Sequence, residues 1–188
     1  MSIRRFLYRY RSVTPIPGAA VLLVLAKPSP STLTTGLALV LMGGTLRFWG
    51  AAHVGGVVKR IDSVETRKLV THGPYAWVRN PMYIGNFIET TGILIMAWAW
   101  MPWMEIVLCV FFALQFGLIV DLEEDHLRES FGESYLEYET HVNRWLPRIV
   151  PWKGGEKSKA DWRWAMATDY PTGIILGALV ALIFLRWK

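Results

Sequence analysis

The side chains best suited to hold a charged small molecule lie in Arg67–Gly85, where a turn is followed by a helix start. Gly73 and Pro74 form a turn signal. Asn80 is a strong N-cap residue, and Pro81 suits the first helical position, where its missing N–H does no harm. The N-terminus of such a helix presents unpaired N–H groups and the positive end of the helix dipole. The stretch therefore predicts a site for an anionic group of a ligand.

A second group of reactive side chains lies between Asp121 and His126, where four acids occur within five residues. On a continuing helix, Asp121 and Glu124 would share a face, three residues apart. Acidic runs are often solvated helix faces. A role in binding depends on whether the fold brings this run beside the cationic Arg79.

Glu89 and Asn86 lie inside the apolar stretch that follows Pro81. Tyr83, Asn86 and Glu89 recur every three residues and therefore share one stripe of a helix. At a rise of 1.5 Å per residue, Glu89 lies about 12 Å beyond Pro81. An ionisable group at that depth in a membrane is costly and suggests function. The alternative is an ion pair with Arg47 on the preceding apolar stretch, and the residues leave both interpretations open.

Metal and nucleophile chemistry receive no support from the sequence. The four histidines, His53, His72, His126 and His141, match no zinc spacing. The single cysteine, Cys109, allows no disulfide within the chain. Serine or cysteine nucleophile motifs, phosphate-binding loops and the dinucleotide glycine fingerprint are also missing. We therefore predict no metal site.

Composition indicates an integral membrane protein made of helices. The chain has 188 residues, of which 53% are hydrophobic, only 19% are charged and 10 are tryptophan. A soluble chain of this size is rarely so apolar. The net charge of +5 comes from basic residues that flank apolar stretches instead of forming one stripe, which favours contact with a membrane surface over nucleic acid. One domain over residues 1–188 is expected.

Five apolar stretches predict five transmembrane helices in an all-α polytopic bundle. They lie near residues 12–28, 32–54, 82–100, 104–120 and 171–187. The segments 55–81 and 121–170 carry most of the Lys and Arg outside these spans, which places them and the N-terminus in the cytoplasm. Aromatic and charged residues alternate from Phe131 to Pro147, as in an amphipathic helical segment on the membrane surface. The third and fourth spans form a hairpin, so topology brings Tyr75–Tyr83 beside Asp121–His126.

Two sequence blocks resemble one family of membrane-embedded methyltransferases. The first block is KLVTHGPYAWVRNPMYIG, from Lys68 to Gly85, and the second is EEDHLRESFGESYLEY, from Glu123 to Tyr138, followed by Leu146-Pro147. Together they are similar to the family that includes isoprenylcysteine carboxyl methyltransferase and phosphatidylethanolamine N-methyltransferase. The resemblance covers about half of the chain, from Arg67 to Pro147.

The resemblance implies a membrane-bound transferase that uses S-adenosylmethionine at the cytoplasmic end of the bundle. Together with the charges and the depth described above, it leads us to expect catalytic roles for Arg79, Glu89 and Glu124. It assigns cofactor binding to Lys68, Leu69, Val70, His72, Gly73, Tyr75, Asn80, Pro81, Met82, Tyr83, Glu123 and Glu124. The chemistry of these residues agrees, because a helix start and Arg79 can bind the cofactor carboxylate, Glu124 its ammonium group, and tyrosine rings its adenine or sulfonium.

Two departures from the family pattern concern the methyl acceptor. The carboxyl methyltransferases usually have histidine where this chain has Asn80. They also place an arginine shortly before the Glu-Glu pair to bind the substrate carboxylate, whereas no Lys or Arg occurs here between Asn80 and His126. Acidic groups attract an amine and repel a carboxylate. The sequence therefore slightly favours a lipid amine, as in phospholipid N-methylation, and leaves open an isoprenylcysteine-type carboxylate bound by Arg47 or Arg79.

Two other functions compete with methyl transfer. NADPH-dependent sterol and steroid reductases have a related glycine, proline and tyrosine block, but the extra phosphate of NADPH should require more basic residues than Lys59–Lys68 supplies. A non-catalytic membrane adaptor would need Glu89 and the acidic run to be structural. Binding of S-adenosylmethionine or of NADPH separates these possibilities, because a ligand stabilises the state it binds.

Overall fold

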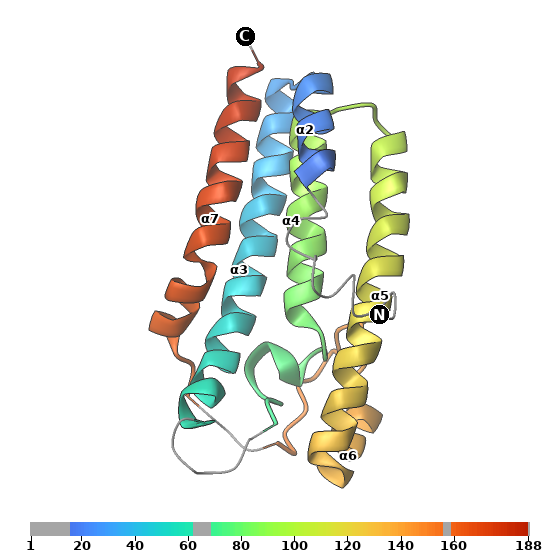
Figure 1. Cartoon of the computed structure of the whole chain (residues 1–188), viewed down its shortest axis with the longest axis vertical. Helices are drawn as coiled ribbons and strands as arrows, with labels where there is room; N and C mark the ends of the chain where they lie inside the picture. Colours follow the sequence, from blue (N-terminus) through green and yellow to red (C-terminus); the bar gives the residue numbers. More distant parts are fainter. Residues whose placement is uncertain (1–15, 62–68, 156–158, 188) are drawn as a thin grey trace. The chain divides into compact units, whose positions relative to one another are not determined.

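The computed structural model describes residues 16–61, 69–155 and 159–187. Within them are six α-helices, one 3₁₀ helix and no strand, so the predicted all-α class is confirmed (Figure 1). The elements are α2 (Ile16–Leu25), α3 (Pro30–Ile61), η1 (Gly73–Ala76), α4 (Pro81–Ala97), α5 (Trp103–Phe131), α6 (Glu133–His141) and α7 (Trp162–Leu185). Lys68 and the first four residues of the predicted span 12–28 lie outside the described residues.

Three of the described helices are long and apolar enough to cross a membrane. They are α3 over Pro30–Gly55, α5 and α7. The predicted count of five spans is not confirmed, because α4 has 17 residues and α2 has 10. At 1.5 Å per residue the described part of α2 is about 15 Å long, and the residues before Ile16 lie outside the described residues.

The C-terminal helix begins nine residues earlier than the predicted span at 171–187. Asp161 caps it, since one carboxylate oxygen accepts the backbone N–H of Trp164 at 2.9 Å. Pro171, which we expected at the helix start, lies inside α7. The prediction followed the apolar run alone and missed the polar N-cap that precedes it.

Helix α5 also runs past its predicted end at residue 120 and continues through the acidic run to Phe131. Gly132 ends it with a left-handed backbone, at φ 53°, and its N–H donates to the Arg128 carbonyl at 2.9 Å. Glycine adopts this conformation without the steric cost that other residues carry. The acidic residues are therefore helical, as the shared face of Asp121 and Glu124 requires.

The chain divides into two compact units, each built from separate stretches of sequence. Unit 1 comprises Met1–Met42, Phe87–Glu124 and Ile174–Lys188, and unit 2 comprises Gly43–Asn86 and Asp125–Gly173. This division does not test whether residues 1–188 fold as one domain, which stays a prediction.

Unit 1 is a packed set of apolar helices. Its core includes residues of α2, α3, α4 and α7: Leu22, Ala26, Leu33, Val40, Ile93, Leu94, Met96, Ala97 and Ile183. A Cβ added at Gly92 would lie 2.7 Å from both the Gly36 carbonyl oxygen and the Val40 nitrogen. Helices α3 and α4 therefore touch through their backbones here, as small residues allow in lipid.

Unit 2 has two smaller apolar clusters. One gathers Ala51, Ala52 and Ala165 from α3 and α7, and the other gathers Tyr135, Tyr138 and Val142. The two tyrosines, expected on an amphipathic surface segment, are buried in this core. Trp152 and Leu69 pack against them, so α6 anchors the segments on either side of it in sequence.

Candidate active site

The predicted turn at Gly73-Pro74 is the 3₁₀ helix η1, and its shape depends on glycine. Gly73 has φ +62°, and a Cβ added there would overlap the imidazole ring of His53 on α3. The His53 and His72 rings lie 5.0 Å apart between centroids. His53 is buried, and its Nδ1 lies 2.9 Å from the Trp49 carbonyl oxygen. The turn is therefore fixed against one face of α3.

Two residues predicted to bind the cofactor meet at Gly50 of α3. A Cβ added at Gly50 would lie 2.7 Å from Cγ of Met82 and 3.6 Å from the Tyr75 hydroxyl. Gly50 is buried. The missing side chain thus lets groups from η1 and α4 converge on one point of α3, and any larger residue would fill that space.

The helix start at Pro81 is confirmed, and Ile84 N–H donates to the Asn80 carbonyl at 3.2 Å. A second glycine contact holds this end of α4 against α3. A Cβ at Gly85 would lie 2.7 Å from the Gly43 carbonyl oxygen and 2.9 Å from the Arg47 nitrogen. Such close approach fixes the direction in which the N-terminus of α4 points.

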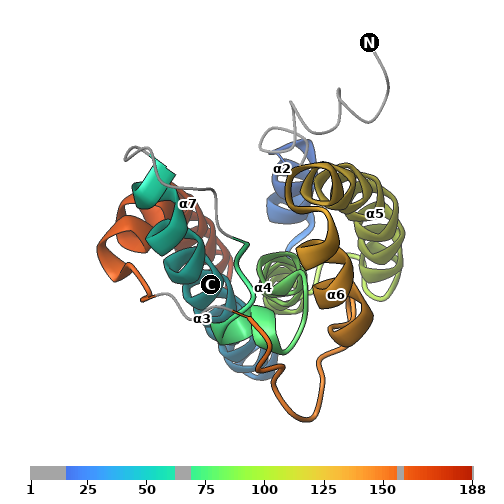
Figure 2. The same cartoon turned by 90° about the horizontal axis from the view of Figure 1, so that it is seen from below.

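The segment around α6 holds the turn through hydrogen bonds to its backbone. The Tyr138 hydroxyl donates to the Tyr75 carbonyl at 2.8 Å. Beyond α6, the Arg79 N–H donates to the Asn143 carbonyl at 2.9 Å, and the Asn80 amide donates to the Arg144 carbonyl at 3.3 Å. Figure 2 shows the segment after α6 passing beside the turn that precedes α4. The turn is therefore fixed by directional bonds.

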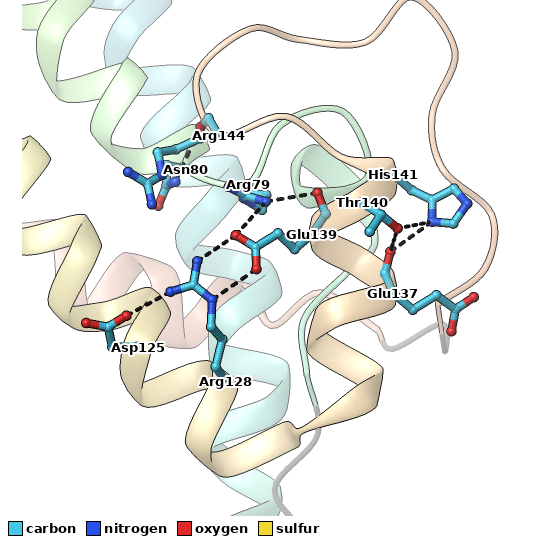
Figure 3. A network of polar contacts seen from close by, with 9 residues as sticks. All are labelled: Arg79, Asn80, Asp125, Arg128, Glu137, Glu139, Thr140, His141 and Arg144. Carbon is cyan, nitrogen blue, oxygen red and sulfur yellow. Dashed lines mark hydrogen bonds and ion pairs between the residues drawn. The ribbon is translucent and has the colours of Figure 1, made fainter.

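An ion-pair network joins Arg79 to the C-terminal part of α5 (Figure 3). Arg79 Nη1 donates to the Glu139 backbone carbonyl at 3.0 Å and lies 3.4 Å from its carboxylate. Arg128 donates to both oxygens of that carboxylate, at 3.0 and 2.6 Å. Arg128 also donates to Asp125 at 2.7 Å. One residue of the acidic run, Asp125, is thus linked to Arg79 through two intermediate side chains.

The arginines determine the electrostatics of this network. The hydrogen bond from Arg128 lowers the pKa of the Glu139 carboxyl below its ordinary value of 4.5, and the charges of Arg79, Arg128 and Arg144 lower it further against partial burial. Glu139 is therefore ionised at neutral pH. The charges of three arginines therefore act on the Glu139 carboxylate.

Three predicted residues belong to unit 1. Glu123 and the buried Glu124 are on α5 at the end of unit 1, and the buried Glu89 belongs to unit 1 on α4. Their assigned roles stay predictions. Arg47, considered as a partner of Glu89, lies 3.6 Å from the Asp169 carboxylate of α7.

Four residues of this arrangement escaped sequence reasoning as site residues: Gly50, Arg128, Glu139 and Arg144. Gly50 carries no chemical signal, because its contribution is an absent side chain. The interval without Lys or Arg, from Asn80 to His126, ends only two residues before Arg128. Glu139 and Arg144 follow the tyrosine block, where the charge pattern indicates a surface segment. Only the packing of α6 brings them beside Arg79 and Asn80.

Comparison with known proteins identifies a family for most of this region. The model of a family described as phospholipid methyltransferase matches residues 31–134. The human protein-S-isoprenylcysteine O-methyltransferase is 36% identical over 128 residues, which cover 61% of this chain and 41% of that protein. The mouse protein of the same name is 35% identical over 119 residues.

A bacterial protein of another name is similar over a comparable length. The cobalt-zinc-cadmium resistance protein CzcN of Cupriavidus metallidurans is 29% identical over 126 residues, 67% of this chain and 54% of that protein. The matches to the human, mouse and bacterial proteins cover between two fifths and just over half of each of those proteins. No solved structure matches the chain.

Proposed function

We propose, because this chain belongs to the phospholipid methyltransferase family, that it transfers a methyl group from S-adenosylmethionine to a lipid-like acceptor at the membrane surface. The observation that carries this proposal is the meeting of Tyr75, Met82 and the start of α4 around Gly50. These groups come from η1 and α4 and pack so closely against α3 that a Cβ at Gly50 would collide with Met82.

The residues of unit 2 fit the charges of S-adenosylmethionine. The N-terminus of α4 and the guanidinium of Arg79 would hold its carboxylate, because both are positive and adjacent in sequence. The ring of Tyr75 would contact the sulfonium or the adenine. Leu69, Val70, His72 and Gly73 would line the turn, and Lys68 belongs to the same proposed set. Glu123 and Glu124 of unit 1, of which the sequence assigns Glu124 to the ammonium group, remain sequence-based predictions.

When bound, S-adenosylmethionine supplies an activated methyl group on a sulfonium, and the acceptor atom displaces the thioether. The protein needs to align acceptor, methyl carbon and sulfur and to exclude water. Its own contribution is rigidity: the bonds from Tyr138, Asn143 and Arg144 fix the turn that would carry the cofactor. Displacement of that turn by one ångström would lower the rate strongly.

We propose a carboxylate as the methyl acceptor. The sequence favoured an amine because no Lys or Arg occurs between Asn80 and His126, but the comparisons do not support that preference, since the human and mouse relatives are named O-methyltransferases. Neither the reductase nor the adaptor alternative gains support from the family.

A methyl-transfer assay tests the reaction and the acceptor together. The protein in lipid nanodiscs is supplied with radiolabelled S-adenosylmethionine and an S-isoprenylated N-acetylcysteine. The matched control is the same compound with its carboxylate replaced by a carboxamide, and a third arm contains phosphatidylethanolamine. We expect label only in the free carboxylate. Label only in phosphatidylethanolamine would overturn the acceptor, and no label in any arm would count against methyl transfer.

The sidedness of the site is a separate proposal. We propose, from the distribution of Lys and Arg, that the N-terminus and the segments 55–81 and 121–170 face the cytoplasm. A cysteine introduced at the exposed Ser130 of α5, in a Cys109→Ala background, should react with a membrane-impermeant maleimide only in inverted vesicles or lysed cells. Equal labelling of intact cells would contradict this orientation.

A further inference from the structure

The segment that follows α6 combines exposed apolar side chains with positive charge. Ile149 is 95% exposed, Leu146 74% and Val150 60%. Trp145, in the same segment, is also exposed, as is Trp77 of the turn. Large apolar side chains gathered in this way on a protein surface mark a contact surface. We call residues 143–153 the interfacial segment.

Backbone hydrogen bonds hold the interfacial segment in place beside the turn. Arg148 N–H donates to the Trp77 carbonyl at 2.8 Å, and Trp152 N–H donates to the Ala76 carbonyl at 2.9 Å. Together with the bond from Arg79 to Asn143, three bonds pair this segment with residues 76–79. The exposed side chains are therefore carried by a fixed backbone, so their exposure belongs to the fold of unit 2.

The turn that carries this segment contacts α3 near the end of the apolar stretch of that helix. Residues 73–75 lie against Gly50 and His53 of α3. Those two residues belong to the last turns of Pro30–Gly55, the part of α3 that can span a membrane. Asp161, which caps α7, also contacts this part of α3, because its backbone N–H donates to the Ala52 carbonyl at 2.7 Å. The turn that carries the interfacial segment thus lies at the end of the apolar stretch of α3, the level at which we expect hydrocarbon to meet headgroups.

The charge of the segment matches an anionic lipid surface. Residues 143–155 contain Arg144, Arg148 and Lys153 and no acidic residue. Tryptophan and arginine are typical of the membrane–water boundary, where one end of the side chain is apolar and the other is solvated. A soluble partner protein would require no such alignment with the end of a membrane-spanning stretch.

We propose that the interfacial segment inserts Leu146, Ile149 and Val150 into the headgroup region of an anionic phospholipid bilayer, with its basic residues paired to lipid phosphates. The contact does not depend on the proposed reaction. The interfacial segment would then link the bilayer to the backbone of residues 76–79, because it is hydrogen-bonded to them.

Fluorescence quenching in nanodiscs tests this contact. A single cysteine replaces Ile149 in a Cys109→Ala background and carries an environment-sensitive fluorophore. Ser130→Cys, also exposed in unit 2, is the matched control. Lipids brominated near the headgroup should quench the label at 149 about twofold or more above the label at 130, with the reverse order for aqueous iodide. Leu146→Cys repeats the measurement at a second position.

Two outcomes would overturn the proposal. Iodide quenching at 149 equal to that at 130 would place the segment in water. Protection from both bromolipid and iodide would show that protein, such as a second copy of the chain, covers it. The charge requirement is tested by Arg148→Gln and by nanodiscs of phosphatidylcholine alone. Each should reduce bromolipid quenching at 149, and unchanged quenching would show that positive charge contributes nothing.

Discussion

Unit 1 and unit 2 both bring α3 against α4 at a glycine, yet they differ in what surrounds that contact. In unit 1, Gly92 lies against Gly36 and Val40 within a continuous apolar core. In unit 2, Gly85 lies against Gly43, and the neighbouring turn is held by an ion-pair network and by hydrogen bonds from the α6 region.

This difference indicates which unit can hold side chains and backbone in a precise geometry. Apolar packing is strong but has little directional preference, so helices can adjust by small shifts. Hydrogen bonds and bidentate ion pairs lose strength quickly when their geometry changes. The turn proposed to hold the cofactor lies in unit 2, and directional bonds hold it there.

The largest effect should come from Gly92→Val in unit 1. The added side chain would collide with the backbone of α3, and we expect a loss of about 3 kcal/mol in stability. Gly117→Ala on α5 is the control, because nothing lies within 4 Å of a Cβ added there; it should stabilise its helix by about 1 kcal/mol. Thermal unfolding in detergent measures both. Equal midpoints for the two variants would contradict the close backbone contact.

Glu139→Gln should produce the largest effect among the polar contacts of unit 2. The substitution leaves Arg79 and Arg128 without their shared carboxylate. We expect a loss of about 1–2 kcal/mol, reduced from the value for buried pairs because Arg128 is about one third exposed. Glu137→Gln, an exposed position on the same helix, should change the unfolding midpoint very little. If both variants behave alike, the network does not stabilise unit 2.

Tyr138→Phe tests a single hydrogen bond in that unit. It removes the hydroxyl that donates to the Tyr75 carbonyl and keeps the buried ring in the core. We expect a loss of about 1 kcal/mol and faster hydrogen exchange at residues 75–78. Exchange rates that match the wild type would show that this bond does not hold the turn.

The smallest effect concerns acid. The folded pKa of Glu139 lies below 4.5, so its ionised form stabilises the fold fully above that pH, and this stabilisation is lost as pH falls through the folded pKa. The advantage of the wild type over Glu139→Gln should therefore be constant from pH 7 to about 5 and shrink in more acidic solution. Paired melts over this range measure it; an advantage that disappears already near neutral pH would contradict the lowered pKa.

Much of the fold followed from local signals in the sequence. Apolar composition predicted helices in a membrane, and Asn80-Pro81 gave the start of α4 correctly. Helix ends were less accurate where the polar residue that decides them lies outside the apolar run, as Asp161 does for α7. The number of spans also could not be taken from apolar runs alone, because α4 is a complete helix of 17 residues.

The site could be predicted in part, through residues close together in sequence. Tyr75, Arg79 and Asn80 were found because their types and spacing point to ligand binding. Glu139 and Arg144 contact that stretch across about 60 residues of sequence. Such contacts depend on how α6 packs, which no local pattern encodes. The amine preference, which counted charges along the sequence, gains no support from relatives that are named O-methyltransferases.

The central claim is that the turn and helix start at residues 69–83 hold S-adenosylmethionine. Photo-crosslinking of radiolabelled S-adenosylmethionine to the protein in nanodiscs, followed by peptide mapping, tests it most directly. We predict label within residues 69–83 that excess S-adenosylhomocysteine removes and that NADPH leaves unchanged. Label confined to other residues, or label displaced by NADPH, would contradict the claim.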